Sequence, residues 1–338
     1  HQLAQRPHGG EVVHLDLSEA AIGVALERVE RLGIPNVTAE QGSLLEASPE
    51  DLGHFDYINC SGVLHHLPDP SAGVRALRRL LNDDGVMGIM VYGKYGRHGL
   101  YPAQDLLRRL AESYSLPEQV TIARRVLPQL PVQHPLKRNG IVGYLDSLSD
   151  TELVDRYLHP CDRAYTVPQV LDWMGETAMR VIDFVPALRY SAALLVADPW
   201  IIAEIARMPL FERYAVAELW SFHLDRHSFF AVRDDNATQP LQPGPDVVAS
   251  VRNASHLARQ LQNQSAFRFR IDQATYRVPL RPTPVHQRIL EAVDGRRTLA
   301  ELSEDLQVSW ARFLDVFLDL YTPLLGATYA TLAKPSGD

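Results

Sequence analysis

One acidic residue, Asp16, ends a short apolar segment and stands just before Ser18, a residue type that commonly caps helices. The segment over residues 11–17 reads as a strand, and the amphipathic stretch over residues 19–33 reads as a helix. In an open α/β sheet, an acid at the carboxyl end of a strand accepts hydrogen bonds from the two hydroxyl groups of a nucleotide ribose. Asp16 is therefore a candidate ligand-binding residue. The alternative is an ordinary acid that interacts with the dipole of the next helix.

A second group of candidates follows a predicted strand over residues 54–61. Cys60, Ser61 and Gly62 stand at its carboxyl end, where ligands collect in such sheets. The alternative for Cys60 is a small core residue, and nothing suggests a thiolate nucleophile. His65 follows in the loop and is a candidate general base that takes a proton from a substrate. The alternative is a loop histidine bonded to a backbone carbonyl. No metal site is predicted, because a third ligand at a recognisable spacing is missing.

Tyrosines and an arginine follow the next predicted strand, over residues 86–92. Tyr95 and Tyr101 are candidate catalytic residues, because a tyrosine face can stabilise a cation or stack on a substrate. Arg97 has the geometry to orient a carboxylate or phosphate. The alternative is that these side chains pack a helical insertion onto the sheet.

The elements that must position these residues alternate between strands and helices. Further elements are expected as a helix end and turn over residues 1–10, a strand over 36–41, a helix over 71–81 and a turn over 82–85. Strands that alternate with helices at this spacing predict βαβ units and a mainly parallel sheet, and hence an α/β fold.

The remaining chain divides into four parts. Residues 94–165 form a proline-punctuated helical insertion, and residues 166–233 end the sheet domain. In that second part we expect a helix over 166–177, strands over 180–185 and 227–233, and a helical excursion over 199–222. Residues 234–245 are a polar, proline-rich linker to a module over 246–338. For the module we expect a strand pair over 267–280, helices over 284–293, 298–306 and 309–323, and a strand over 327–332.

Composition narrows the function classes. The 338 residues suit two domains or one large elaborated domain, and the 46% hydrophobic content is that of a globular protein. The net charge of −8 argues against a nucleic-acid partner. Two distant cysteines form no disulfide framework, so a cytoplasmic location is expected. The sequence contains no apolar run long enough to span a membrane.

The joint pattern resembles class I S-adenosylmethionine-dependent methyltransferases. The resemblance rests on residues 15–18, Gly42 to Leu45, Phe55 to Ile58, Gly62 to Leu67, Leu80 with Leu81, and Asp84 with Gly85. It covers residues 11–93 well and 166–233 loosely, so residues 1–93 are identified as a partial methyltransferase core.

The resemblance implies a Rossmann-like sheet with strand order 3-2-1-4-5-7-6 and an antiparallel last strand. It implies S-adenosyl-L-methionine as methyl donor, with Asp16 and Leu17 at the ribose, Ser43 and Leu44 at the adenine, and Cys60, Ser61 and Gly62 at the methionine portion. Many members carry an Asp at the position of Ser43, and a hydroxyl accepts more weakly. The family's first strand and its glycine-rich turn should lie just before His1. We therefore expect a truncated chain, an empty position in the sheet and weak cofactor binding.

The C-terminal module resembles small winged-helix folds related to the peptide chaperone of quinone-cofactor biosynthesis. The pattern is Ile289 to Leu299, then Leu302, Leu306 and Phe313 to Leu320. Similar modules are regulatory appendages behind bacterial methyltransferases, so an α+β winged-helix-like regulatory domain is expected.

The function predicted from the resemblance is methyl transfer to a small molecule or a protein side chain. The motif of adenine-N6 or glutamine-amide methylation is absent where Cys60 to Val63 stand, which disfavours a nucleic-acid acceptor. One alternative is a non-catalytic relative that acts as a protein-binding partner. The other is an NAD(P)-dependent oxidoreductase, because the same acid serves that class. A homodimer is compatible with the sequence.

Overall fold

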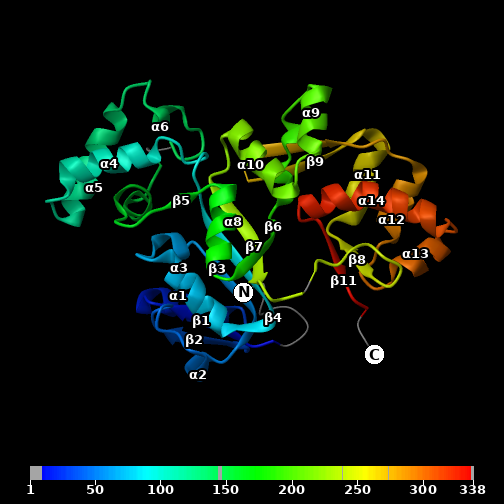
Figure 1. Cartoon of the computed structure of the whole chain (residues 1–338), viewed down its shortest axis with the longest axis horizontal. Coiled ribbons are helices and arrows are strands. Elements are labelled where there is room, and N and C mark those ends of the chain that lie inside the picture. The colour runs from blue at the N-terminus through cyan, green and yellow to red at the C-terminus, as the bar shows by residue number, and fades with distance from the viewer. Residues whose placement is uncertain (1–9, 144–146, 238, 273, 336–338) are drawn as a thin grey trace.

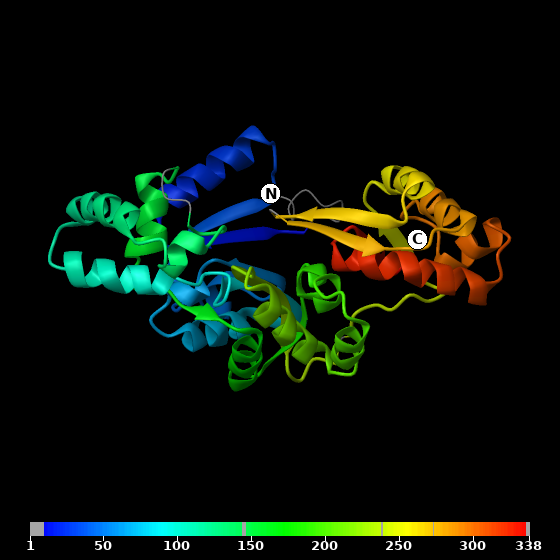
Figure 2. The same cartoon turned by 90° about the horizontal axis from the view of Figure 1, so that it is seen from above.

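A computed structural model describes residues 10–143, 147–237, 239–272 and 274–335 (Figure 1). Apart from Gly10, the helix end and turn expected over residues 1–10 lie outside the described residues. The chain is arranged as two connected groups of strands, a helical insertion on one side and a C-terminal module on the other (Figures 1 and 2).

The first βαβ unit follows the sequence pattern closely. Strands β1 (Val12–Asp16) and β2 (Val37–Gln41) are parallel, and helix α1 (Glu19–Arg31) connects them. Helix α1 begins after Ser18, whose hydroxyl accepts a hydrogen bond from the backbone N–H of Ala21 at 3.3 Å. A short helix, α2 (Pro49–Leu52), precedes the next strand. The predicted parallel unit with a capped helix is confirmed.

The main sheet has the order β3–β4–β7–β6. Its strands are β3 (Phe55–Ser61), β4 (Leu81–Gly93), β6 (Met179–Phe184) and β7 (Arg226–Arg233). Strands β3 and β4 are parallel, whereas β7 is antiparallel to both of its neighbours. The order β3–β4–β7–β6 matches the 4-5-7-6 part of the strand order that the resemblance implies, and the separate pair β2–β1 matches its 3-2 part.

One sequence expectation was wrong at the start of β4. Residues 82–85 were predicted as a turn, but the strand already begins at Leu81. The pairing of β3 with β4 shifts between Phe55 and Tyr57, so this part of the ladder is irregular. A Cβ atom at Gly85 would lie 2.8 Å from the Leu81 side chain, which explains the glycine. The polar residues therefore mark an irregular strand start.

Strands β1 and β3 are not joined in one sheet within the described residues, where β1–β2 and β3–β4–β7–β6 form separate ladders. Helix α1 also packs loosely on the rest of the chain, because none of its residues is buried. Leu17 is 73% exposed and Val24 is 50% exposed. The described residues thus leave β1 and β3 unjoined, and an empty strand position between them stays an expectation.

Helices complete the sheet domain. Helices α3 (Pro70–Leu80) and α8 (Val167–Glu176) pack near each other, and α9 (Pro199–Ala206) and α10 (Leu210–Ser221) lie beyond β6 (Figure 1). Their apolar faces share one core with the strands. Representative core residues are Leu64, Val74, Met87, Ile89, Val170, Met174 and Phe229.

The insertion predicted over residues 94–165 is helical and has its own core. It contains α4 (Leu100–Ala111), α5 (Leu116–Val126), α6 (Pro135–Arg138) and α7 (Asp150–Leu153), followed by a wider helical turn over Val154–Leu158. Leu100, Leu107, Leu136 and Tyr157 are among the buried residues of this core. A two-residue strand, β5 (Ala164–Tyr165), returns the chain to β4.

The C-terminal module contains the predicted elements and two that sequence reasoning missed. Its elements are β8 (Val248–Val251), α11 (Ala254–Asn263), β9 (Ala266–Ile271), β10 (Ala274–Pro279), α12 (Pro284–Ala292), α13 (Leu299–Asp305), α14 (Trp310–Gly326) and β11 (Ala330–Ala333). Strand β8 pairs with β11, and helix α11 follows β8. Strand β8 has only four residues and so gives a weak periodic signal, whereas α11 carries apolar residues at helical spacing.

Asp272 links the module to the sheet domain. Its carboxylate pairs with Arg226, the first residue of β7, and lies 3.4 Å from Arg189. Asp272 has a φ of 53°, a conformation that Asn also tolerates. We expect Asp272→Asn to weaken docking of the module by about 1 kcal/mol, because one charge of a partly exposed network is lost.

The weakened docking should appear as faster proteolytic cleavage in the linker over residues 234–245. Asp246→Asn is the control, since Asp246 is exposed in the same region. Equal cleavage rates for the two variants would contradict a docking role for Asp272.

Candidate functional site

The first cluster of predicted cofactor residues lies at the carboxyl ends of β1 and β2. The Asp16 carboxylate accepts a hydrogen bond from the Ser18 N–H at 2.8 Å, and the Asp16 carbonyl accepts one from the Gly42 N–H at 3.0 Å. Gln41 donates to the Leu17 carbonyl at 3.4 Å. These bonds hold Asp16, Leu17 and the start of the next loop together. One carboxylate oxygen of Asp16 orders the turn, and the other has no hydrogen bond within the described residues.

Ser43 and Leu44 follow directly in that loop. The Ser43 hydroxyl accepts a hydrogen bond from the Leu45 N–H at 3.2 Å, so part of its accepting capacity orders its own turn. Leu44 packs against the core of the sheet domain. A contact of this loop with an adenine would therefore use the Ser43 hydroxyl as donor or the backbone groups.

The second cluster lies at the carboxyl end of β3. Cys60 is 6% exposed, and burial raises the pKa of its thiol to about 12, so the side chain stays a neutral thiol. The Ser61 hydroxyl donates to the Asn59 side-chain oxygen at 3.3 Å. Gly62 turns the chain with a φ of 79° and donates its N–H to the Met90 carbonyl at 3.1 Å. The cluster can offer backbone groups and small side chains to a ligand, but no nucleophile.

His65 is enclosed just after this turn. It lies in a short helix over Leu64–His66, is completely buried, and neither ring nitrogen has a hydrogen-bond partner within the described residues. Burial, assisted by the nearby His66, Arg97 and His159, lowers its pKa to about 3. An imidazole with such a pKa is a weak base at neutral pH. Its role as general base therefore stays a prediction that burial disfavours.

The Arg97 guanidinium already has partners within the protein. Its guanidinium lies 3.6 Å from the centre of the Tyr92 ring, and its Nη2 atom lies 3.1 Å from Asp162. The side chains of both charged residues are almost fully buried. Because Asp162 already holds this guanidinium, Arg97 anchors the insertion to the sheet, as the alternative interpretation of this segment expects.

The two candidate tyrosines separate in space. The Tyr95 ring packs on Phe222, with ring centres 5.0 Å apart. Tyr101 lines a cavity, and its buried hydroxyl group interacts with the Arg97 guanidinium. Burial raises the pKa of Tyr101 well above its usual range, so this side chain is a neutral phenol that can donate a hydrogen bond. Only Tyr101 of this pair faces a space that a ligand can fill.

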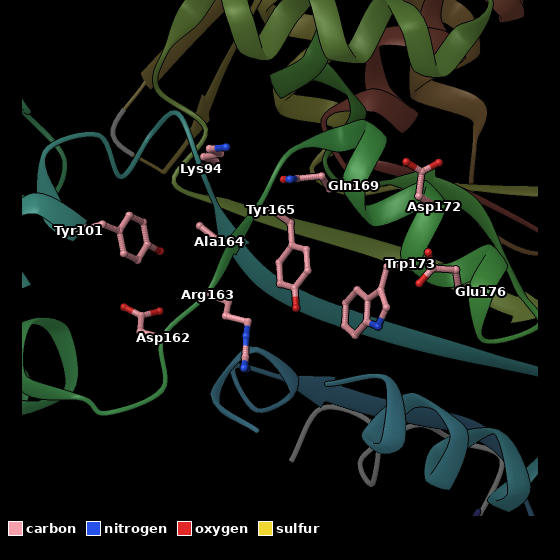
Figure 3. Close-up of a pocket in the computed structure, with 10 residues that line it drawn as sticks. All are labelled: Lys94, Tyr101, Asp162, Arg163, Ala164, Tyr165, Gln169, Asp172, Trp173 and Glu176. Atoms are coloured by element: carbon pink, nitrogen blue, oxygen red, sulfur yellow. The ribbon is translucent and has the colours of Figure 1, made fainter. Parts of the chain in front are cut away.

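The cavity of about 480 Å³ lies between β5, α8 and the start of the insertion (Figure 3). The last pair between β3 and β4 is Ser61 with Met90, and β5 then pairs with Tyr92 and Gly93. Strand β5 therefore continues beyond the carboxyl end of β3, which is the edge where ligands bind in such sheets. A larger cavity, of about 830 Å³, lies between α5 and α7, away from the strands.

Sequence reasoning missed most of the cavity wall. Tyr165 and Trp173 stack with ring centres 4.9 Å apart and an angle of 11° between their planes. Trp173 belongs to the core of the sheet domain, and its ring N–H donates a hydrogen bond to the Ser71 hydroxyl at 3.1 Å. Gln169 and Trp173 are four residues apart on α8, so the sequence predicts that they share one helix face. That spacing does not indicate that the face lines a cavity.

Two further properties concern ligands and membranes. The described residues contain no group of three or more histidine, cysteine, aspartate or glutamate side chains arranged to hold a metal ion. Within the same residues, no helix combines the length and apolar character needed to cross a membrane.

The sequence has relatives among methyltransferases. Residues 1–87 match a family model described as a methyltransferase domain. An uncharacterized protein of Synechococcus, syc1184_c, is 28% identical over 68% of this chain and 56% of its own length. The ubiquinone biosynthesis O-methyltransferase of Pseudomonas paraeruginosa is 37% identical over 25% of this chain and 34% of its own length. The chain thus spans about half of one relative and a third of the other.

The fold has a solved counterpart. The structure of PKMT2 from Rickettsia typhi matches with a TM-score of 0.61 and 14% identity, covering 96% of this chain and 67% of that chain. A second structure of PKMT2, in complex with AdoHcy, matches equally well with 13% identity. At this identity, the likeness concerns the fold. The chain therefore shares its fold with PKMT2, and its residues 1–87 are similar to a methyltransferase domain.

Proposed function

We propose that this protein is an S-adenosylmethionine-dependent methyltransferase whose acceptor is a small molecule or a protein side chain. The observation that carries the proposal is the order β3–β4–β7–β6 with β7 antiparallel, together with Asp16 at the carboxyl end of β1 in the parallel β1–β2 unit. The similarity of residues 1–87 to a methyltransferase domain supports it. A C-terminal winged-helix-like regulatory module and a cytoplasmic location belong to the same proposal.

The residues present suit this cofactor. Asp16 keeps one carboxylate oxygen for ribose hydroxyl groups, and the turn at Gly62 offers close backbone approach beside β3. The cofactor, when bound, supplies a methyl group already activated on a sulfonium. The protein then has to orient the acceptor, receive its proton and exclude water, which is catalysis mainly by positioning.

We further propose that a strand lies between β1 and β3 in the working sheet, whichever segment supplies it. Both strands present an edge that is unpaired within the described residues, and α1 has no buried residue. Such a strand would join the two halves of the cofactor site. Without it, we expect S-adenosylmethionine to bind more weakly than the micromolar range. Micromolar binding by residues 1–338 in isothermal titration would contradict the need for this strand.

Asp16→Ala tests the proposed cofactor site. In a protein that includes the proposed strand between β1 and β3, removing the carboxylate should weaken S-adenosylhomocysteine binding by roughly tenfold to a hundredfold, because one or two hydrogen bonds to a charged group are lost. Asp51→Ala is the control, since Asp51 is an exposed acid in α2. The measurement is isothermal titration, and unchanged affinity in Asp16→Ala would refute the assignment.

Two further measurements separate the alternatives. Incubation with labelled S-adenosylmethionine and a cell extract should label an acceptor. A chain that binds the cofactor but labels nothing would favour a non-catalytic relative. Titration with NADH tests the oxidoreductase alternative, and we expect no binding.

A further inference from the structure

One face of the hairpin formed by β9 and β10 is strongly basic. Phe267 and Phe269 of β9 are buried in the core of the C-terminal module. The alternate residues Arg268 and Arg270 therefore lie on the opposite, outer face. Arg277 of β10 pairs directly with Arg268 and shares that face, and all three arginines are exposed. Figure 2 shows the hairpin, in yellow and orange, extending from the module toward the sheet domain.

The protein does not neutralise the charge of this face. None of the three guanidinium groups makes a hydrogen bond or an ion pair within the described residues. Asp272 is the only acid between residues 264 and 282, and its carboxylate is paired with Arg226 and Arg189. Arg281, just beyond β10, adds a further exposed positive charge. A chain with a net charge of −8 thus concentrates positive charge on one hairpin.

The pairing of two arginines costs stability. Arg268 and Arg277 stand directly opposite each other, and like charges in such a pair destabilise a two-stranded sheet. The neighbouring pair on the same face, Arg270 with Thr275, avoids this repulsion. A face that only needed to be soluble could carry threonine or mixed charges throughout. The concentration of arginine at a cost to folding therefore indicates a binding surface.

The residue type and the spacing favour carboxylates on an extended chain. A guanidinium group binds a carboxylate through two parallel hydrogen bonds. Arg268 and Arg270 are two residues apart in β9, which separates them by about 7 Å along the strand, and alternate side chains of an extended ligand have the same spacing. The other positions of the outer face hold Ala266, Thr275 and Pro279, so it offers no aromatic ring on which a nucleic-acid base could stack.

We infer that the outer face of the β9–β10 hairpin binds an extended, acidic segment of a partner protein. Alternate carboxylates of that segment pair with Arg268, Arg270 and Arg277. The residues that match a methyltransferase domain end at residue 87, so this surface lies in a different part of the chain. The inference does not depend on the cofactor site or on methyl transfer.

Fluorescently labelled peptides test both charge and spacing. One peptide alternates glutamate with threonine, so all its carboxylates lie on one side of the extended chain. A second has the same number of glutamates at every third position, which puts neighbouring carboxylates on opposite sides. Fluorescence anisotropy with the full chain at low salt should show the alternating peptide binding about fivefold more tightly, because only it can pair with Arg268 and Arg270 together. Added salt should weaken this binding.

Variants locate the binding surface. Arg268→Gln and Arg277→Gln should each weaken binding of the alternating peptide by about fivefold, because each removes one ion pair. Arg296→Gln is the matched control, since Arg296 is exposed in the same module and its loss changes the net charge equally. The two hairpin variants should also keep or raise the midpoint of urea denaturation, because each relieves the repulsion between Arg268 and Arg277.

Each contrary outcome has a distinct meaning. Equal affinity for the two glutamate peptides, or an equal loss in Arg296→Gln, would show attraction by net charge alone and overturn the inference. Tighter binding of an oligothymidylate than of the alternating peptide would overturn it in favour of single-stranded nucleic acid. A lowered denaturation midpoint in both hairpin variants would make the arginines structural and would also overturn it. Titration with S-adenosylhomocysteine reports separately on the proposed function.

Discussion

Lowering the pH from about 7.5 to about 5 is expected to reduce the free energy of unfolding by about 2 kcal/mol through His65 alone. Its pKa is about 3 in the folded chain, whereas the ordinary pKa of a histidine is 6.5. A depressed folded pKa means that the unfolded state binds the proton more readily. The stabilising contribution is therefore complete above pH 6.5 and is lost progressively as the pH falls toward 3.

His65→Leu isolates this contribution. Leucine is close to histidine in volume, and it removes two buried ring nitrogens that have no partner within the described residues. Urea denaturation at both pH values should show a smaller pH effect in this variant, with little loss of stability near pH 7.5, because an unsatisfied polar group is replaced by an apolar one. His54→Leu, at an exposed histidine, should keep the parent's pH effect. An unchanged pH effect in His65→Leu would assign the acid sensitivity to other groups.

The strand order was predictable because each strand carries its own local pattern. Alternation, capping residues such as Ser18 and turn glycines such as Gly33 set the elements to within a few residues. The start of β4 was not predictable, since its irregular pairing depends on Phe55 in another strand. Helix α11 was missed although Leu257, Ala258 and Leu261 recur at helical spacing and are buried, so this pattern was available in the sequence.

Only some residues of the candidate site could be identified from the sequence. Asp16 and Gly62 could be found, because they follow strands directly in the chain. Asp162 and Tyr165 could not, since they reach the carboxyl end of β3 through a helical insertion of about seventy residues whose path the local pattern does not encode. In the sequence, Asp162 is a single acid before a two-residue strand, and nothing marks it as a site residue. Only the folded structure places it beside Arg97 and Tyr101.

The end of the insertion also fixes the loop that carries the β3 cluster. Arg163 donates hydrogen bonds to the carbonyls of Leu67 and Pro68, the second at 2.9 Å. The His66 ring lies 2.9 Å from the Cys161 carbonyl through its Nδ1 atom. The loop after Gly62 and the wall of the cavity are therefore one connected structure. A change that displaces the insertion should disturb both.

Gly99→Ala is the change expected to displace the insertion most, with a loss of at least about 3 kcal/mol in the stability of α4. Gly99 precedes α4 with a φ of 83°, where an L residue is strained. A Cβ atom there would also overlap the Leu136 backbone nitrogen and come within 2.6 Å of the Pro135 carbonyl carbon. Backbone atoms cannot move aside as a side chain can, so α4 must separate from α6. Tyr101 lies two residues further on and would leave the cavity with α4.

Substitutions at two other glycines distinguish the cost of backbone strain from the cost of steric overlap. Gly33 has a φ of 61° but nothing within 4 Å of its Cβ position, so Gly33→Ala should cost only about 1 kcal/mol in α1. Gly23 lies inside α1 with open space around it, so Gly23→Ala should stabilise that helix by roughly 0.5–1 kcal/mol. Hydrogen exchange measured separately on α1, α4 and α6 reports the opening free energy of each helix. If Gly99→Ala costs no more than Gly33→Ala, then α4 and α6 are not held as closely as their backbones indicate, and the position of Tyr101 in the cavity would lose its structural basis.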